Sequence, residues 1–203
     1  SYLAVVRHLS VNSQKTALNS LVFMYKQFLR VDLGVLSYAP STRPKTLPSV
    51  FSHSEAMAVI GKLSGVPHLA ANLMYGSGLR VMESVRLRVQ DIDFDNDCIV
   101  VRDTKGQKWH PTLLPTSLRS VLKRQIDYAL AVHKTDLENG FGEVYLPGAL
   151  TKKYPKAASS PTWQYIFPAN KLSNDPRANV MRRHHTSDQS IQRPVSKAIS
   201  QAR

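Results

Sequence analysis

The sequence predicts a mainly α-helical protein with a small antiparallel β-sheet, and three observations support this prediction. Apolar residues recur at helical spacing over residues 18–29 and again over residues 118–130. Two short apolar runs flank a Lys-Gly turn within residues 98–114, as expected for a β-hairpin. Three prolines between residues 34 and 48 exclude a regular element there and divide the chain into two parts.

The composition indicates a nucleic-acid partner. The chain has 27 Lys and Arg against 14 Asp and Glu, which gives a net charge of +13, and such an excess suits a partner made of phosphates. No apolar run approaches the ~18 residues of a membrane span, and no signal-peptide pattern opens the chain, so we expect a cytoplasmic protein. Seven His and one Cys without metal-ligand spacing predict no metal site.

The first part of the chain is predicted to contain one helix. The chain starts at Ser1 without an initiator Met, and we interpret this start as the edge of a fragment. Ser10 is a candidate cap for a helix that continues to Leu29. The polar face of this helix carries Lys15 and Lys26, which are either candidate DNA contacts or simply a solvated face.

The linker is basic as well as proline-rich. Pro40, Pro44 and Pro48 alternate with polar residues, and Arg43 and Lys45 are candidate DNA contacts. We therefore predict three parts, at residues 1–33, 34–50 and 51–203.

A capping box opens the second part, because Ser52 is followed three residues later by Glu55. The helix it begins is predicted to run through Leu63 and to end at Gly65 and Pro67. A second helix follows and reaches the turn discussed next.

The glycine turn Gly76-Ser77-Gly78 is the best candidate for a functional site. It feeds a new helix whose first turn carries Arg80, where a guanidinium beside backbone N–H groups suits a phosphate. Glu83 lies three residues further on and can hold the other edge of the guanidinium. The alternative is an ordinary Gly-rich turn with a surface ion pair. Two further candidate DNA contacts follow on the same helix, Arg86 and Arg88.

The predicted hairpin pairs residues 98–102 with residues 109–114 and places Lys105 and Lys108 at its tip. A hairpin-tip lysine serves either phosphate binding or solubility. Thr116 then caps a long amphipathic helix that is predicted to end near His133 or Lys134.

Residues 138–179 combine aromatic and basic side chains. Lys152, Lys153 and Trp163 fit phosphate contact and base stacking, although a small core uses aromatic residues as readily. A last helix is capped by Ser187 and contains Pro194, which its first turns tolerate.

Together these motifs resemble the tyrosine recombinases, and among them the integron integrases. The resemblance covers nearly the whole chain, and an insertion at about residues 136–186 is specific to the integron subfamily. It rests on Gly76-Ser77-Gly78-Leu79-Arg80 with Glu83, on residues 17–21 and 87–95, on Tyr145-Leu146-Pro147, on Lys153-Tyr154-Pro155 and on Val180-Met181-Arg182-Arg183-His184-His185.

The resemblance implies a DNA clamp made of a helical core-binding domain, a linker and a catalytic domain, of which the first and last are incomplete here. Family members exchange DNA strands through a 3′-phosphotyrosine and require neither metal nor cofactor. Arg80 matches an arginine that stabilises charge on the phosphate, and Lys105 matches a general acid for the departing 5′-oxygen. Glu83 would support Arg80.

The integron-type substrate implied by the resemblance is a folded single-stranded hairpin with unpaired bases, besides double-stranded sites. The resemblance also implies that full-length family members self-associate into a synaptic tetramer on DNA. Arg182, Arg183, His184 and His185, with Trp163, match the residues that receive the unpaired bases. The resemblance places the protein with the bacterial nucleoid.

The sequence also departs from the family. The hairpin reads Thr104-Lys105-Gly106, His110 stands where an Arg is common, and the unusual Pro111 follows it. No His-x-x-Arg box occurs, and none of the eight tyrosines lies where the nucleophile is expected. We therefore expect these 203 residues to bind DNA without cleaving it. Two alternatives stay open, a shortened non-catalytic DNA-binding relative and a basic RNA-binding structural protein.

Overall fold

The computed structural model describes residues 2–36, 49–102, 109–146 and 150–202. The chain divides into two compact units, Ser1–Val50 and Phe51–Arg203, and each is described by itself. Both units are mainly helical, and the sheets of the second are small and antiparallel, so the predicted fold class is confirmed. No helix in the described ranges has the length and apolar character needed to cross a membrane.

Unit 1 contains α1 (Tyr2–Val5) and α2 (Val11–Phe23), and a π-helical turn (Met24–Phe28) continues α2. The Ser10 side chain accepts a hydrogen bond from the backbone N–H of Ser13, which confirms the predicted cap. No residue of α2 or the π-helical turn is buried. The apolar stripe on this helix therefore has no core of its own within the described residues.

Three helices of unit 2 pack together: α3 (His53–Gly61), α4 (Gly65–Ser77) and α8 (Gln189–Ala202). The capping box of Ser52 and Glu55 is present as predicted. The expected role of Gly65 and Pro67 was wrong, since α3 ends at Gly61 and these two residues begin α4. Proline suits this place because the N–H groups of a first helical turn have no intrahelical partner.

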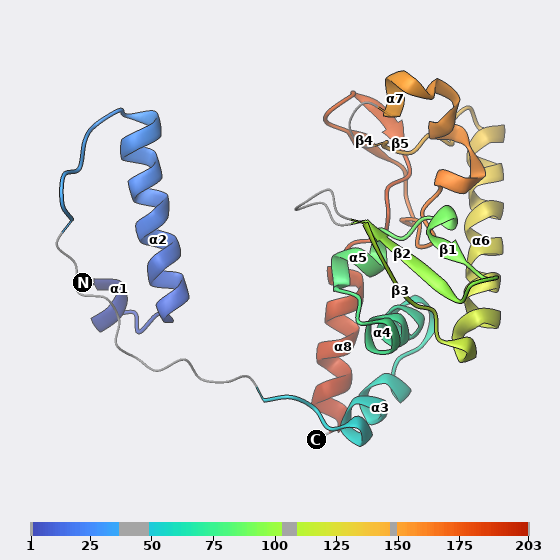
Figure 1. Cartoon of the computed structure of the whole chain (residues 1–203), viewed down its shortest axis with the longest axis horizontal. Helices are drawn as coiled ribbons and strands as arrows, with labels where there is room; N and C mark the ends of the chain where they lie inside the picture. Colours follow the sequence, from blue (N-terminus) through green and yellow to red (C-terminus); the bar gives the residue numbers. More distant parts are fainter. Residues whose placement is uncertain (1, 37–48, 103–108, 147–149, 203) are drawn as a thin grey trace. The chain divides into compact units, whose positions relative to one another are not determined.

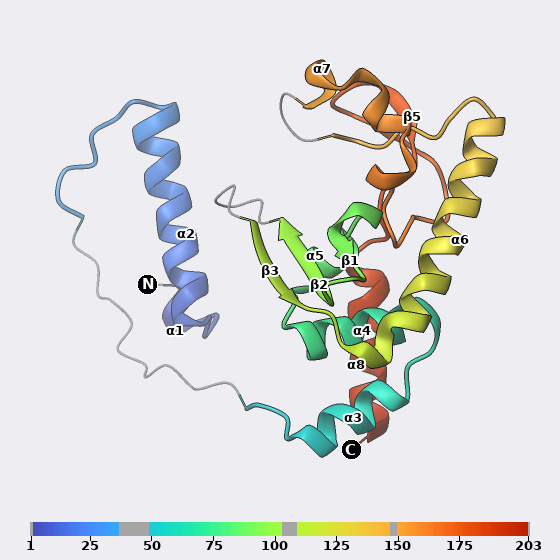
Figure 2. The same ribbon diagram turned by 45° about the vertical axis from the view of Figure 1, so that its right-hand side comes forward.

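The three-stranded sheet has the order β1-β2-β3 and consists of β1 (Ile92–Asp93), β2 (Cys98–Arg102) and β3 (Trp109–Leu113). The predicted hairpin is therefore confirmed, with β1 as an additional strand. Ile99 and Val101 point into the main core. That core also contains residues from α4, α6 and the segment after Gln164, namely Leu69, Leu73, Leu122, Ile126, Ile166 and Phe167. Figures 1 and 2 show the sheet beside α4 and α6.

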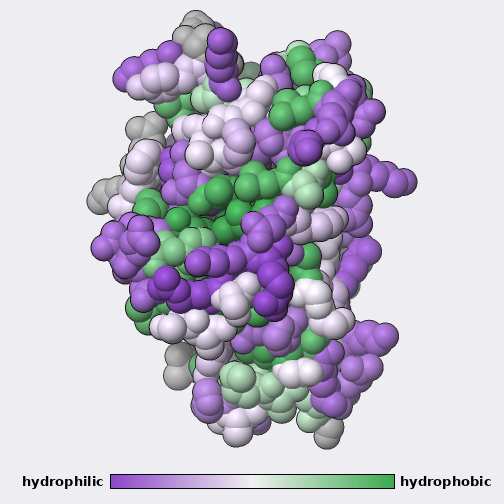
Figure 3. Space-filling model, turned by 90° about the vertical axis from the view of Figure 1, so that its right-hand side faces the viewer, coloured by the Kyte–Doolittle hydropathy of each residue, from purple (hydrophilic) through white to green (hydrophobic). Residues whose placement is uncertain are grey.

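The long helix α6 (Arg119–Glu138) extends past the predicted end near His133. Its last buried positions are polar, at His133 and Asp136, so the apolar pattern stops before the helix does. Figure 3 looks at the side on which α6 lies in Figure 1 and shows an apolar band bordered by hydrophilic side chains.

A separate lobe follows α6 and has its own small core of Val144, Leu146, Ala158 and Tyr165. It contains α7 (Leu150–Lys153) and the hairpin of β4 (Ser173–Asp175) and β5 (Val180–Arg182). Figure 1 shows these three elements grouped at one end of unit 2. The short helix α5 (Val81–Val85) lies between α4 and this lobe in the sequence.

Candidate nucleic-acid interface

Two glycines shape the chain before Arg80: Gly76, in the last turn of α4 rather than in the predicted turn, and Gly78, which ends the helix. Gly78 ends α4 in the left-handed region, at φ 67°, which side chains of L-residues rarely adopt. A Cβ on Gly76 would lie 2.7 Å from Cγ of Pro115. The chain can thus turn sharply out of α4 and pack against Pro115, which places Arg80 at the start of α5.

Arg80 and Glu83 make the predicted contact. Glu83 accepts a hydrogen bond from the backbone N–H of Arg80 at 2.7 Å and another from its guanidinium Nη1 at 2.6 Å. The Glu83 side chain is 12% exposed and that of Arg80 is 77% exposed. A largely buried carboxylate therefore orients a guanidinium that faces solvent.

The hairpin is tied to the Arg80 turn by a direct hydrogen bond. The hydroxyl of Thr112 in β3 donates to the backbone carbonyl of Ser77 at 2.8 Å. Lys105 and Lys108, the predicted tip residues, lie outside the described residues, as do Arg43 and Lys45 in the linker. Of the hairpin, the structure thus describes the two strands on either side of residues 103–108.

Arg88 has a different role from the predicted DNA contact. It is only 6% exposed, and its guanidinium donates hydrogen bonds to the carbonyls of Trp163 and Tyr145 and to the hydroxyl of Tyr165. The guanidinium carbon lies 4.4 Å from the centre of the Tyr165 ring. Burial lowers the pKa of Arg88. Because these donors are used inside the protein, we correct the prediction: Arg88 joins the sheet region to the lobe.

Arg182 and Arg183 require the same correction. Arg182 forms ion pairs with Asp175 and Glu143, and its side chain is 14% exposed. Arg183 donates two hydrogen bonds to the carboxylate of Asp136 in α6 and one to the carbonyl of Ala169. The ion pair with Asp136 raises the pKa of Arg183. Arg182 thus holds the lobe together and Arg183 attaches it to α6, so the guanidinium groups of both are engaged inside the protein.

His184 and His185 form a small aromatic cluster with Tyr165. The ring of His184 stacks on Tyr165 with centroids 5.5 Å apart, and His185 meets Tyr165 edge-on at 5.2 Å. His184 is exposed and His185 is partly buried. Burial lowers the pKa of the His185 imidazole to about 4 and also lowers the pKa of His184. His185 is therefore neutral near pH 7, which suits stacking better than binding a phosphate.

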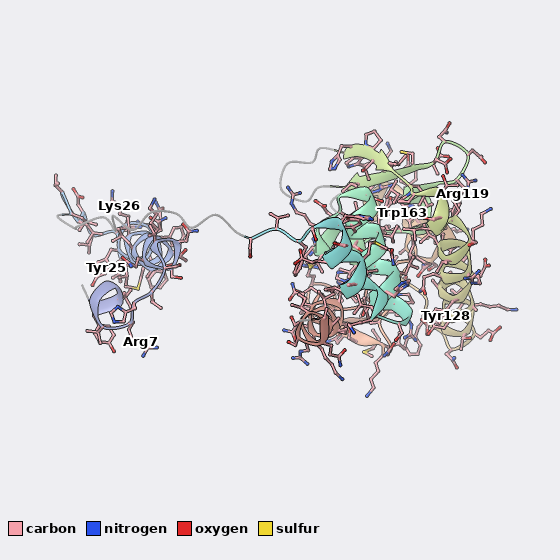
Figure 4. The ribbon with its side chains drawn as sticks, turned by 90° about the horizontal axis from the view of Figure 1, so that it is seen from below. Arg7, Tyr25, Lys26, Arg119, Tyr128 and Trp163 are labelled. Atoms are coloured by element: carbon pink, nitrogen blue, oxygen red, sulfur yellow. The ribbon has the colours of Figure 1, made fainter. Side chains whose placement is uncertain are left out.

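The other predicted contacts lie at the surface or at its edge. Trp163 is partly buried beside Arg88, whereas Lys15, Lys26, Arg86 and Lys153 are exposed. The side chain of Lys152 is outside the description. Figure 4 shows Lys26 on unit 1 and Trp163 on unit 2. In the described ranges, no three His, Cys, Asp or Glu side chains are gathered as metal ligands.

Sequence reasoning missed Asp91 and Arg102. Asp91 is 3% exposed and accepts hydrogen bonds from the backbone N–H of Arg88 and from Nε of Arg102. Burial raises the pKa of Asp91, although Arg102 opposes this effect. The sequence held a signal for Arg102. The predicted pairing of residues 98–102 with residues 109–114 can place Arg102 opposite Trp109, as the structure shows.

Comparison with known proteins identifies the family. The chain belongs to the phage integrase family, the tyrosine recombinases, whose family model matches residues 43–202. It is 41% identical over all 203 residues to proteins named integrase/recombinase from Escherichia coli and from Pseudomonas aeruginosa. The chain spans 60% of the length of each.

A solved structure supports the fold. The XerH site-specific recombinase, in a crystal structure bound to its difH substrate as a pre-cleavage complex, matches with a TM-score of 0.56 at 16% identity. The match covers 99% of this chain and 52% of that chain. At this identity the likeness defines the fold alone.

Proposed function

We propose that this chain is the DNA-binding part of an integron-type site-specific recombinase, made of a core-binding segment, a linker and an incomplete catalytic domain. One observation carries the proposal: a solvent-facing guanidinium, Arg80, is held by Glu83 on a turn that is itself hydrogen-bonded to the hairpin. In this proposal Arg80 and Lys105 bind the same DNA phosphate. The net charge of +13 supports binding to a polyanion.

The proposed substrate is a folded single-stranded hairpin with unpaired bases, alongside double-stranded sites. His184 offers an exposed ring that is already stacked on Tyr165. Trp163 lies close by, because the Arg88 guanidinium contacts the rings of both Trp163 and Tyr165. Unpaired bases stack on such rings, whereas the bases of a perfect duplex are not available to do so. Arg86, Lys153, Lys15 and Lys26 are exposed cations that would contact phosphates.

Strand transfer itself is proposed for a protein that also carries the family's His-x-x-Arg box and nucleophilic tyrosine. These 203 residues contain neither in the expected sequence context. We therefore propose that they bind DNA without forming a covalent adduct. Assembly into synaptic tetramers and location at the nucleoid are proposed for the recombinase that carries those residues.

The test is an affinity comparison by fluorescence anisotropy between 50 and 200 mM salt. The ligands are a DNA hairpin with two unpaired bases, a fully paired hairpin of equal length and an RNA copy. We expect steep salt dependence and tightest binding to the DNA with unpaired bases. Equal binding to all three would favour a general RNA- or DNA-binding protein and overturn the integron-type proposal.

Arg80→Ala is the informative variant. We expect it to weaken DNA binding about tenfold, the effect of losing one charge-assisted contact. Arg193→Ala is its matched control, because Arg193 is an exposed arginine in unit 2 outside the proposed interface. Equal losses in both variants would show that only net charge matters.

A further inference from the structure

The outer face of the β2-β3 pair carries an exposed tryptophan that the proposed function does not use. The burial of β2 alternates, so Ile99 and Val101 face the core while Arg102 faces outward. Arg102 lies directly opposite Trp109 in the strand register. Residues opposite each other across a strand pair share one sheet face, so the two side chains are neighbours.

Arg102 is fixed in place behind the Trp109 ring. Its guanidinium carbon lies 4.5 Å from the centre of that ring and 5.3 Å from the centre of the Trp163 ring. Its Nε donates to the buried carboxylate of Asp91 at 2.5 Å. A carboxylate that is 4% exposed thus holds the guanidinium in contact with two aromatic rings.

Trp109 nevertheless remains 63% exposed. One ring face is backed by an anchored cation, and most of the indole is open to water. An exposed indole does not gain the free energy that burial of its apolar surface would give. Because contact with Arg102 already restricts the ring, it loses little conformational entropy when a flat partner stacks on it. The partner that fits is a flat ring attached to negative charge.

We propose that Trp109 is a stacking surface for an unpaired nucleobase of the bound DNA strand, with Arg102 as the residue that positions it. This inference rests on the proposed DNA-binding function and adds a base contact beside the hairpin, separate from His184 and His185. An anionic strand suits the site better than an apolar protein partner, because Arg102 lies against the ring and the chain is strongly basic.

The first experiment compares Trp109→Ala with Leu113→Ala. Leu113 is 64% exposed and lies four residues further along the same strand face, so it controls for loss of an exposed apolar side chain. We expect Trp109→Ala to weaken binding to a single-stranded oligonucleotide at least about fivefold, as for loss of one stacked base. Its affinity for a fully paired duplex should change less than twofold, and Trp109→Phe should restore most of the loss. An equal loss for both ligands, or none, overturns the proposal.

A second experiment reads the ring directly. Trp109 and Trp163 are the two tryptophans of the chain, so Trp163→Phe leaves Trp109 as the fluorescent reporter. We expect a solvent-exposed emission that a single-stranded oligonucleotide quenches at the concentrations where anisotropy reports binding. Binding without quenching, or a blue-shifted emission that shows the ring already covered, overturns this inference and leaves the proposed function standing. Absence of salt-dependent DNA binding would contradict both this inference and the proposed function.

Discussion

Thr112 in β3 and Ser77 at the end of α4 are joined by a hydrogen bond of 2.8 Å from the threonine hydroxyl to the serine carbonyl. The last carbonyls of a helix have no intrahelical partner, so this hydroxyl satisfies one of them. The bond connects the strand that follows Lys105 to the turn that precedes Arg80. Within the described residues, it therefore ties β3 to the end of α4, one residue before Gly78.

Replacing Thr112 by Val tests this connection. The variant keeps the shape of the side chain but leaves the Ser77 carbonyl without its donor. We expect the free energy of unfolding in urea to fall by about 1 kcal/mol. Thr135→Val is the control, since its exposed hydroxyl donates only to a carbonyl within α6 at 3.3 Å, and it should change stability by less than about 0.5 kcal/mol. Equal effects would mean that the hairpin is held by other contacts.

Gly78→Ala should destabilise the fold through the backbone. A side chain at φ 67° is strained, and the expected loss of unfolding free energy is about 1–2 kcal/mol. Gly61→Ala is the matched comparison, because a Cβ at Gly61 meets nothing within 4 Å and its φ lies outside the left-handed region. Thermal unfolding should show a lower Tm for Gly78→Ala alone. A Tm unchanged in both would contradict the steric account of the turn.

Arg183→Gln should act on stability rather than on DNA. The change leaves the Asp136 carboxylate, 7% exposed, without its bidentate partner, and we expect a loss of about 2–4 kcal/mol in unfolding free energy. At a temperature where the variant remains folded, its affinity for DNA should fall less than that of Arg86→Ala. A stable variant with selectively weakened DNA binding would restore the original prediction for Arg183.

Stability should decrease as the pH falls below neutral because of His185. The folded-state pKa of about 4 is lower than the usual value of 6.5, so the unfolded chain binds a proton first. This contribution is fully present above pH 6.5 and is lost as the pH falls toward 4, by about 1 kcal/mol per pH unit or less after allowance for solvent. His184 acts in the same direction. In His185→Asn, urea unfolding between pH 7 and pH 5 should show a weaker pH dependence; an unchanged slope would contradict the assignment.

The fold was predictable where local chemistry decides it. The capping box at Ser52, the cap at Ser10 and the β2-β3 hairpin follow from short-range signals, and all three are present. The end of α6 was not predictable in this way, because its last buried positions are His133 and Asp136, whose burial depends on tertiary partners. Apolar spacing alone cannot show that a charged residue faces inward.

The same limit explains which predicted site residues were misassigned. A basic residue in a recognition motif looks the same in sequence whether its partner is a phosphate or a buried carboxylate. Arg88 and Arg183 have protein partners that are 75 and 47 residues away in the chain, Trp163 and Asp136. Arg80 differs because its partner, Glu83, lies three residues away, so the contact could be predicted from spacing.

The most direct test of the account is a double-mutant cycle for DNA affinity with Arg80→Ala, Lys105→Ala and the double variant. If the guanidinium and the ammonium bind one phosphate, each single change removes part of a shared interaction, and the losses should depart from additivity by at least about 0.5 kcal/mol. Losses that add within about 0.3 kcal/mol would place the two groups on separate parts of the DNA and contradict the shared site.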